Sequence, residues 1–363
     1  MTWLVTGGAG YIGGHVVRAL VEQGVRVVVL DDLSTGDASR VEGVPLVCAS
    51  LLHREAVEAT LAEHQVRGVV HIAAKKQVGE SVADPYYYFR QNVLGQLTLM
   101  EAMRAADVRR FVFSSSAAAY GAPDAAQVEE KTHLEPESPY GQTKVVGEWL
   151  AVDADTAYGV RSVCLRYFNV AGAATAELGD PVALNLIPMV FERLTAGLRP
   201  LLFGDDYPTP DGTCVRDYIH VADIASAHVA AARHLEGGGE SLRLNIGRGQ
   251  GSSVREVLAM IADVTGLDTT PEVVARRPGD PPRTVAGADA IRDRLGWTAQ
   301  YDLRAMWSRR GPAGCCATRT QTNCERSSEL GRLRAGGGPA RGRSSRRLAS
   351  AGRPGRCDRP RSV

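Results

Sequence analysis

Three side chains in this sequence are of the types needed to move a proton to and from a hydroxyl group. Tyr140 and Lys144 are four residues apart, and Ser116 stands 24 residues before Tyr140. A spacing of four places the phenol and the ammonium on one face of a helix, one turn apart. A free phenol has a pKa of about 10, and a nearby cation is expected to lower it. With Ser116 sharing the proton, the three groups predict removal of a proton from a sugar or alcohol hydroxyl while a hydride leaves its carbon.

The start of the chain supplies a context for this chemistry, because a Tyr-x-x-x-Lys pair alone is common on surface helices. Residues 2–6 are an apolar run typical of a buried parallel strand, and glycines follow at positions 7, 10 and 13. Residues 15–23 predict a helix that Gly24 ends, and residues 25–30 predict a second strand that leads to Asp31. Strand, glycine turn, helix, strand and acid in this order predict a dinucleotide-binding site.

The glycine turn and the acid also indicate which dinucleotide is bound. Glycines let the backbone approach a pyrophosphate, and the helix N-terminus favours its negative charge. Asp31 lies 18 residues after Gly13, where it can accept hydrogen bonds from the adenine ribose. Because its charge would repel a 2′-phosphate, we expect NAD rather than NADP. The spacing G-x-x-G-x-x-G differs from the G-x-G-x-x-G of many dehydrogenases.

Strand and helix patterns alternate along the first half of the chain. Strands are expected at residues 67–73, 110–114 and 160–168, and helices at residues 54–63, 87–106 and 140–156. This alternation predicts an α/β fold with a doubly wound, Rossmann-like parallel sheet. We expect an NAD-binding domain over residues 1–170, to which segments around 215–250 return. A smaller C-terminal α/β substrate lobe is expected over residues 171–307.

Charge is distributed unevenly over the 363 residues, whose net charge is +1. Residues 308–363 contain 14 Arg and three acids, a charge of +11, which leaves −10 for the first 307 residues. Low hydrophobicity with high charge predicts disorder for this tail. Its composition resembles translation of a GC-rich gene in a shifted frame. Electrostatic binding to nucleic acid is the alternative, but no aromatic residues are interleaved, and we expect no nucleic-acid partner.

The rest of the composition indicates the cellular compartment and gives no sign of a metal centre. No stretch resembles a transmembrane helix or a signal peptide, so no membrane partner and a cytoplasmic location are expected. Cys48, Cys164 and Cys214 are isolated in the first 307 residues and fit a reducing compartment. No cysteine spacing resembles a zinc site, and no metal is expected.

Several motifs together carry a resemblance to a known family. They are Gly7-Gly8-Ala9-Gly10-Tyr11-Ile12-Gly13, Ser114-Ser115-Ser116-Ala117-Ala118-Ala119-Tyr120-Gly121, Tyr140-x-x-x-Lys144 and Arg166-Tyr167-Phe168-Asn169-Val170-Ala171-Gly172. The chain resembles the extended short-chain dehydrogenase/reductases and, more narrowly, the UDP-glucose 4-epimerases. The resemblance runs from residue 2 to about 306, and its most specific part is residues 207–221, Y-P-T-P-D-G-T-C-V-R-D-Y-I-H-V.

The resemblance implies an enzyme of galactose and nucleotide-sugar metabolism. It would be an isomerase that inverts C4 of a UDP-hexose, UDP-glucose or UDP-galactose, through a 4-keto intermediate, with NAD as cofactor. Tyr140 would be the base and Ser116 its hydrogen-bonding relay to the sugar 4-hydroxyl. Lys144 would lower the phenol pKa and hold the nicotinamide ribose. The resemblance also implies a homodimer that pairs through the helices at 87–106 and 140–156.

Two sets of binding residues are carried over from the family. The residues implied to hold NAD are Gly7, Gly10, Tyr11, Ile12, Gly13, Asp31, Asp32, Leu33, Ser34, Thr35, Gly36, Ser50, Leu51, Ile72, Ala73, Ala74, Lys76, Gln91 and Phe168. The residues implied to hold the UDP-sugar are Asn169, Asn185, Phe203, Arg216, Arg277, Asp280 and Thr284. Two arginines suit a diphosphate, and an aromatic ring can pack on uracil. Without the resemblance, Arg216 would be interpreted as an ion pair with Asp217, and Arg277 with Asp280 as a loop-stabilising pair.

The superfamily also contains enzymes with other activities. Ala117, Ala118 and Ala119 stand where a 4,6-dehydratase carries an acid-base pair and a decarboxylating relative carries Glu. A nucleotide-sugar dehydrogenase or reductase and a non-catalytic NAD-binding protein are the alternatives left open. Turnover of a sugar nucleotide would exclude the non-catalytic protein, which would bind NAD tightly without turnover.

Two residues depart from the family pattern. Ser50 stands where the family often has an acid against adenine, so we expect weaker binding of adenine. Thr284 stands where some members carry a Tyr that walls the sugar pocket. The smaller residue leaves room at the sugar 2-position, and some activity on UDP-N-acetylglucosamine is expected.

Overall fold

The computed structural model describes residues 1–180, 185–277 and 280–306. All of them fall within one compact unit. The tail expected at 308–363 lies outside the described residues. Across the ranges that are described, no helix is long and apolar enough to cross a membrane.

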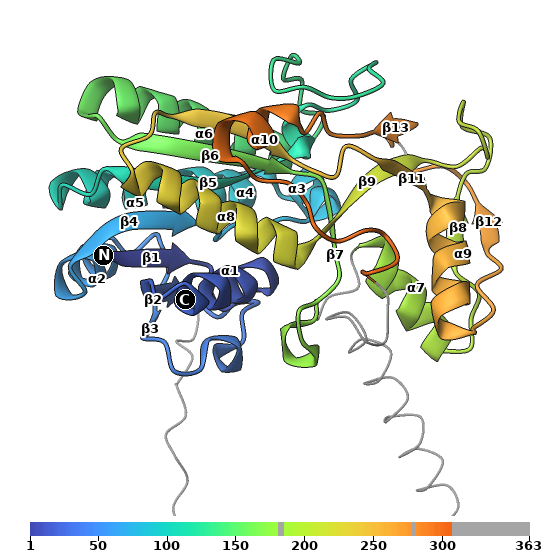
Figure 1. Ribbon diagram of the computed structural model, residues 1–363, viewed down its shortest axis with the longest axis horizontal. Coiled ribbons are helices and arrows are strands. Elements are labelled where there is room, and N and C mark those ends of the chain that lie inside the picture. The colour runs from blue at the N-terminus through green and yellow to red at the C-terminus, as the bar shows by residue number, and fades with distance from the viewer. Residues whose placement is uncertain (181–184, 278–279, 307–363) are drawn as a thin grey trace, which may run out of the picture. The chain divides into compact units, whose positions relative to one another are not determined.

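A seven-stranded parallel sheet forms the centre of the described chain (Figure 1). In spatial order its strands are β10 (Leu242–Ile246), β6 (Arg161–Tyr167), β5 (Arg110–Ser116), β4 (Val66–His71), β1 (Thr2–Thr6), β2 (Arg26–Asp31) and β3 (Leu46–Cys48). Each neighbouring pair is parallel. The chain builds outward from β1 in one direction and then in the other. This is the predicted doubly wound fold, and it creates a switch point between β1 and β4, where such sheets bind ligands.

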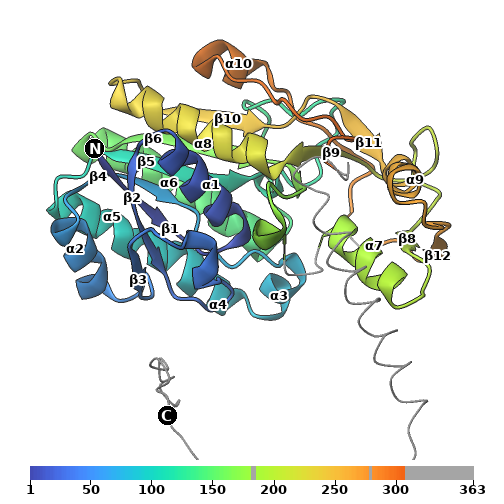
Figure 2. The ribbon, with the colours of Figure 1, turned by 60° about the horizontal axis from the view of Figure 1, so that its bottom comes forward.

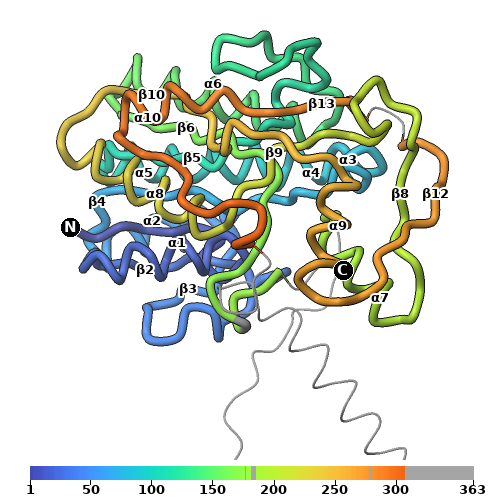
Figure 3. Tube along the Cα trace, turned by 45° about the vertical axis from the view of Figure 1, so that its right-hand side comes forward, coloured from blue at the N-terminus to red at the C-terminus, as the bar shows by residue number. Residues whose placement is uncertain are grey.

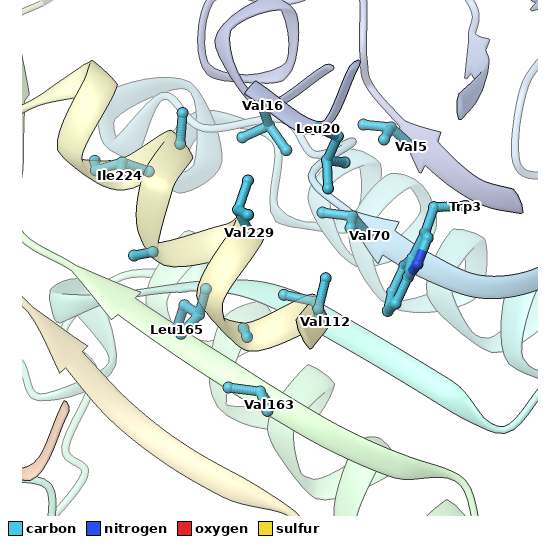
Figure 4. Close-up of a cluster of buried hydrophobic side chains, with 14 of the residues drawn as sticks. Trp3, Val5, Val16, Leu20, Val70, Val112, Val163, Leu165, Ile224 and Val229 are labelled. Atoms are coloured by element: carbon cyan, nitrogen blue, oxygen red, sulfur yellow. The ribbon is translucent and has the colours of Figure 1, made fainter. Parts of the chain in front are cut away.

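Helices cover both faces of the sheet. On one face lie α1 (Tyr11–Glu22) and α8 (Val221–Glu236), and on the other lie α2 (Arg54–Glu63), α5 (Gly95–Ala105) and α6 (Pro139–Tyr158). The strands are apolar on both sides because both sides are buried. Figure 4 shows the core beneath α1 and α8, which includes Trp3, Val5, Val16, Leu20, Val70, Val112, Val163, Leu165, Ile224 and Val229.

Two of the expected helices differ from the observed ones. The first was expected at residue 15 but begins at Tyr11, so its first turn contains Gly13 and Gly14, residues that have little helix propensity of their own. The second, expected as one helix over residues 87–106, is divided. It consists of α4 (Pro85–Tyr88), a π-helical segment η2 (Phe89–Leu94) and α5. Apolar periodicity does not reveal such a π turn, which places the buried Asn92 side chain inward.

The part of the chain after β6 forms a smaller group of strands and helices. Its elements are β7 (Asn169–Ala171), α7 (Leu186–Thr195), β8 (Leu201–Phe203), β9 (Val215–His220), β11 (Gly251–Ser253), α9 (Val254–Thr265), β12 (Glu272–Val274) and β13 (Arg283–Thr284). Strand β9 pairs with β7, β11 and β13, and β8 pairs with β12. Figures 1, 2 and 3 show α7, α9, β8 and β12 gathered at the end of the molecule away from β1.

The smaller group does not contain every element beyond residue 170. Both β10 and α8 belong to the layers of the large sheet, and α10 (Asp289–Leu295) packs against these two elements. The boundaries of the two lobes at residues 170 and 307 stay a prediction. Short elements complete the described chain: α3 (Val78–Ala83) and the 3-10 turns η1 (Ala38–Val41), η3 (Ala117–Ala119) and η4 (Ala176–Leu178).

Candidate active site

Helix α6 presents Tyr140 and Lys144 at its N-terminal end. The Ser138 hydroxyl caps the helix by accepting from the Gly141 N–H at 3.2 Å, and Pro139 occupies the first turn. A serine cap followed by proline is a strong helix start, because both satisfy or remove unpaired N–H groups. The predicted helix over 140–156 is thus confirmed with slightly longer bounds. It fixes the two side chains one turn apart on the face toward β5.

Lys144 is buried and is held by the strand beside it. Its Nζ donates a hydrogen bond to the carbonyl oxygen of Ser114 at 2.8 Å. The ammonium lies 5.0 Å from the ring centroid of Phe113 and 5.8 Å from that of Tyr140. Burial lowers the pKa of Lys144 to about 8, while the negative charge of Glu148 acts to raise it.

Lys144 was expected to lower the pKa of Tyr140, and that expectation is wrong. Burial is the largest influence and raises the pKa of Tyr140, and a side-chain hydrogen bond with Ser116 opposes it. Burial disfavours a phenolate because the charge loses its hydration. The sequence shows the spacing of Tyr and Lys but gives no measure of how deeply the helix start is buried.

Ser116 ends β5 and lies beside the helix start. Its Cα partner on the next strand is Tyr167 of β6, and its hydroxyl accepts from the Ala118 N–H at 3.2 Å. The same side chain makes the hydrogen bond with Tyr140. The structure therefore brings the three predicted catalytic side chains together at the carboxyl edge of the sheet.

The glycine turn connects β1 to an α1 helix that has an open N-terminus. A Cβ on Gly13 would overlap the Gly7 carbonyl oxygen, and a Cβ on Gly7 would lie 2.6 Å from the Ala73 backbone nitrogen. The N-cap of α1 is Gly10, which supplies no side-chain cap. The first N–H groups of α1 therefore remain suited to an anion. This turn fits a pyrophosphate, because only glycine can pack so closely.

Asp31 organises the loop after β2. One carboxylate oxygen accepts from the Ala9 N–H and the other from the Leu33 N–H, each at 2.9 Å. Burial raises the pKa of Asp31. Since each carboxylate oxygen has two lone pairs, Asp31 keeps acceptor capacity for a ribose hydroxyl. Asp32 in turn accepts from the N–H and hydroxyl of Ser34.

The remaining residues predicted for the cofactor follow the carboxyl ends of neighbouring strands or face them. Residues Tyr11 and Ile12 start α1, Leu33, Thr35 and Gly36 follow β2, and Ser50 and Leu51 follow β3. Residues Ile72, Ala73, Ala74 and Lys76 follow β4, Phe168 follows β6, and Gln91 lies in η2. The N–H groups of Ile72 and Ala73 both donate to the Thr6 carbonyl, at 3.1 and 3.0 Å. This ties the β4 edge to the glycine turn.

Four of the residues predicted for the sugar nucleotide meet in pairs. Arg216 Nη2 lies 2.5 Å from Asp280 Oδ1 in an ion pair. The Arg277 guanidinium lies 3.8 Å from the ring centroid of Phe203. Neither of the two side-chain pairings expected without the resemblance forms, although the Asp280 N–H donates to the Arg277 carbonyl at 3.3 Å. Asp217 is buried and accepts from the N–H groups of Arg248, Gly249 and Ala286, and Asp280 pairs with Arg216 instead of Arg277.

The other three substrate residues are placed by β9 and α7. In the sheet register Asn169 of β7 is opposite Tyr218, and Thr284 of β13 is opposite Arg216. Thr284 is buried, and its hydroxyl has no hydrogen-bond partner among the described residues. Asn185 is exposed at the N-cap of α7, where its amide donates to Asp180 at 3.3 Å.

Sequence reasoning missed further side chains around Tyr140. Asn92 is buried in η2; its amide bonds the N–H and C=O of Lys75 and donates to the Thr143 hydroxyl at 3.0 Å. Tyr88 and Tyr167 are near enough to Tyr140 to be influenced by its charge. For these three the sequence carries no signal. Glu148, four residues after Lys144, could have been found from helical spacing.

Metal ligation has no support in this region or elsewhere in the described ranges. No group of three or more His, Cys, Asp or Glu residues in them could hold a metal ion. The site combines a proton-transfer group with a glycine turn suited to a dinucleotide, and the arginines Arg216 and Arg277 lie among the smaller strands and their loops.

Comparisons with known proteins agree on one family. Residues 3–247 match the model described as the NAD dependent epimerase/dehydratase family. The chain is 47% identical over 304 residues to UDP-glucose 4-epimerase of Azospirillum brasilense, covering 82% of this chain and 87% of that protein.

Solved structures give the same result. A UDP-glucose 4-epimerase from Brucella ovis in complex with NAD has a TM-score of 0.82 and 41% identity, covering 84% of this chain and 95% of that one. A UDP-glucose-4-epimerase from Stenotrophomonas maltophila, with bound NAD and formylated UDP-arabinopyranose, has a TM-score of 0.83 and 41% identity. That match covers 89% of this chain and 99% of the other.

Proposed function

The chain belongs to the NAD dependent epimerase/dehydratase family, and from this premise we propose that it inverts C4 of a UDP-hexose as an NAD-dependent UDP-glucose 4-epimerase. The observation that carries the proposal is the meeting of Ser116, Tyr140 and Lys144 at the carboxyl edge of the sheet, the same edge at which β1 leads into the glycine turn. The matches to this chain also cover 87% of the Azospirillum brasilense protein and 95% of the Brucella ovis chain.

In this proposal Tyr140 takes the proton of the sugar 4-hydroxyl and later returns one. Ser116 shares that proton, since its hydroxyl can donate and accept at once. Because burial raises the pKa of Tyr140, the phenol is neutral at rest. A protonated Lys144 beside its ring then favours the charge that develops during proton transfer.

The chain's residues fit NAD as the cofactor. The glycine turn and the first turn of α1 would hold the pyrophosphate, Asp31 the adenine ribose, and Lys144 the nicotinamide ribose. Bound NAD would supply a reversible hydride acceptor beside sugar C4. The protein's part is to hold the 4-keto sugar loosely enough to turn, so that the opposite face of C4 is presented. Binding energy must therefore lie mainly on the UDP part of the substrate.

The smaller strands would supply that binding. Arg216 and Arg277 offer two cations for a diphosphate, and Phe203 offers a ring for uracil. Asn169 on β7 and Asp280 beside Arg216 would add hydrogen bonds to the sugar and ribose. The buried, unpartnered Thr284 hydroxyl would line the sugar pocket, and its small size leaves room for an N-acetyl group.

We also propose a homodimer formed by α5 and α6, which pack against each other. Leu97 on α5 and Trp149 and Val152 on α6 are large apolar side chains exposed to solvent. Exposed apolar patches of this kind mark interaction surfaces. In analytical ultracentrifugation we expect a dimer that Trp149→Glu with Leu97→Glu converts to a monomer; a wild-type monomer would contradict the proposal.

Conversion of UDP-galactose to UDP-glucose by the purified full chain tests the activity. We expect conversion in both directions without added reductant, because the cofactor ends each cycle unchanged. Consumption of NAD in proportion to product would instead indicate a dehydrogenase. No conversion of either sugar nucleotide, with NAD bound, would reject the proposed function.

A further inference from the structure

Glu148 is a buried carboxylate that the mechanism above does not use. It lies one helical turn after Lys144 on α6 and is 1% exposed. One carboxylate oxygen accepts from the Ser115 hydroxyl at 2.5 Å and from Arg166 Nε at 2.8 Å. The other accepts from Arg166 Nη2 at 2.5 Å. All its contacts are charged or polar groups that are themselves buried.

These contacts join the three elements that carry the active site. Ser115 directly precedes Ser116 on β5, and Arg166 directly precedes Tyr167 on β6. Ser115 and Arg166 are also direct neighbours in the sheet register. The Glu148 carboxylate on α6 therefore holds β5 and β6 together at the register pair directly before Ser116 and Tyr167. A slip of the helix along the strands would break three hydrogen bonds at once.

The network continues away from the site and is satisfied throughout. Arg166 Nη1 donates to the Tyr120 hydroxyl at 2.8 Å and to the Glu130 carbonyl at 3.1 Å. The Tyr120 hydroxyl donates to Asn245 on β10 at 2.7 Å. Because every member is paired, the network is a rigid support rather than a set of loose contacts.

Glu148 also determines the charge around Lys144. The titratable groups that face Lys144 are His71 on β4, and Tyr140 and Glu148 on α6. Arg166 on β6 reaches it through Glu148, and His228 on α8 bonds the Ser114 hydroxyl at 3.0 Å. Of these, Glu148 is the group that acts to raise the pKa of Lys144, against burial.

We propose that Glu148 is a positioning residue for the epimerisation: its carboxylate locks the strand of Ser116 to the helix of Tyr140 and Lys144, and its charge keeps the Lys144 ammonium protonated. This inference rests on the proposed function. It predicts a distinct pH behaviour. Activity that needs the ammonium falls as pH rises through the pKa of Lys144, about 8.

The test compares three variants of the full chain. Glu148→Gln keeps the shape but removes the charge, so we expect kcat to fall about 10- to 100-fold. KM should change little, since no substrate contact is altered. The alkaline limb of the pH profile should move down by about one pH unit or more. Ser115→Ala leaves the charge in place and should lower kcat with no movement of the limb.

A third variant separates positioning from simple support of the fold. Glu148→Gln with Arg166→Met removes both buried charges, so neither is left unpaired and the fold should persist. In this double variant we still expect the alkaline limb of the pH profile to lie at lower pH than in wild type. If restoring the melting temperature also restored the wild-type pH profile, the role of Glu148 would be structural and the proposal would be overturned.

A direct titration gives a readout that does not depend on activity. The chain has four lysines, Lys75, Lys76, Lys131 and Lys144. In side-chain-labelled protein, NMR can follow each of them, with Lys144→Met to assign the signal. Glu148→Gln should lower the Lys144 pKa, and an unchanged value would contradict the proposal. Wild-type protein that does not convert UDP-galactose would reject the proposed function instead, whatever this titration gives.

Discussion

Arg216 on β9 and Asp280 form an ion pair at 2.5 Å, although 64 positions separate them in the sequence. The pair is partly buried, and Thr284 stands opposite Arg216 in the neighbouring strand. Two residues that were expected to hold the substrate independently are thus coupled. Asp280 orients the Arg216 guanidinium, and the arginine keeps further N–H donors for a diphosphate.

Arg216→Ala should weaken UDP binding without affecting NAD. A hydrogen bond to a charged group contributes about 1.5–3 kcal/mol, so we expect an increase of about 10- to 150-fold in the Kd for UDP. Asp280→Asn should have a smaller effect, because the cation remains. Calorimetric titration with UDP measures both. Arg255→Ala removes an exposed arginine that pairs with Asp205 at 3.6 Å and serves as the control; an equal loss in all three variants would contradict this account.

Gly13→Ala should abolish tight NAD binding. The new methyl group would overlap the Gly7 carbonyl oxygen, so the turn between β1 and α1 must open. Gly79→Ala is the matched control, because nothing lies within 4 Å of a Cβ there and the residue is helical. That variant should keep its NAD and gain up to about 1 kcal/mol of stability. The amount of NAD retained after purification, measured by absorbance, distinguishes the two variants. Equal retention would show that the glycine turn does not hold the cofactor.

The melting temperature should fall as pH decreases from about 7 to about 5. Burial lowers the pKa of His15 to about 4, of His71 to about 3, and of His220 and His228 to about 4 each. Unfolded histidines titrate at about 6.5. The unfolded chain therefore binds more protons below this pH, so the stabilisation present above 6.5 is lost as pH falls toward 4.

Buried acids act in the opposite direction but do not prevail in this window. Burial raises the pKa of Asp217 to about 6, and raises those of Asp31 and Asp223. These three acids oppose four histidines, so the histidines remain the larger group. His228→Gln should reduce the fall in melting temperature between the two pH values. A melting temperature that is constant over this range would refute the assignment of neutral buried histidines.

Much of this arrangement follows from the sequence, and the parts that do not have identifiable causes. Buried parallel strands are apolar runs, so β1 was predicted with its observed bounds, and α2 follows its apolar period in the same way. The three proposed catalytic residues could be named because the spacing of Tyr140 and Lys144 and the motif around Ser116 can be seen in the sequence itself. Arg216 with Asp280 could not be paired, because tertiary folding brings together positions that local patterns treat separately.

The pKa of Tyr140 shows a second limit of sequence reasoning. Charge proximity can be inferred from a spacing of four, but burial cannot, and here burial is the larger influence. The division of the helix over 87–106 has a similar origin. Asn92 finds its partners on the Lys75 backbone and on Thr143, and neither is visible in the helix's own pattern.

Thr284→Tyr should remove activity on UDP-N-acetylglucosamine while leaving activity on UDP-glucose. Thr284 is buried beside Arg216 in the sheet register, and a larger ring would fill the space expected beside the sugar 2-position. Steric exclusion in a packed site typically costs about 1–3 kcal/mol. Ratios of kcat/KM for the two substrates measure the change. Equal exclusion of the N-acetyl substrate by wild type and variant would contradict the role of Thr284.

The most direct test of the catalytic site is the rate of UDP-galactose conversion in Tyr140→Phe, measured beside wild type and Tyr158→Phe. Tyr158 ends the same helix with an exposed side chain, so it controls for loss of a phenol. We predict a loss of about 10²- to 10⁴-fold for Tyr140→Phe, as for removal of a general base, with NAD still bound and Tyr158→Phe equal to wild type. Conversion by Tyr140→Phe within a few-fold of the wild-type rate would contradict the assignment of Tyr140 as the base.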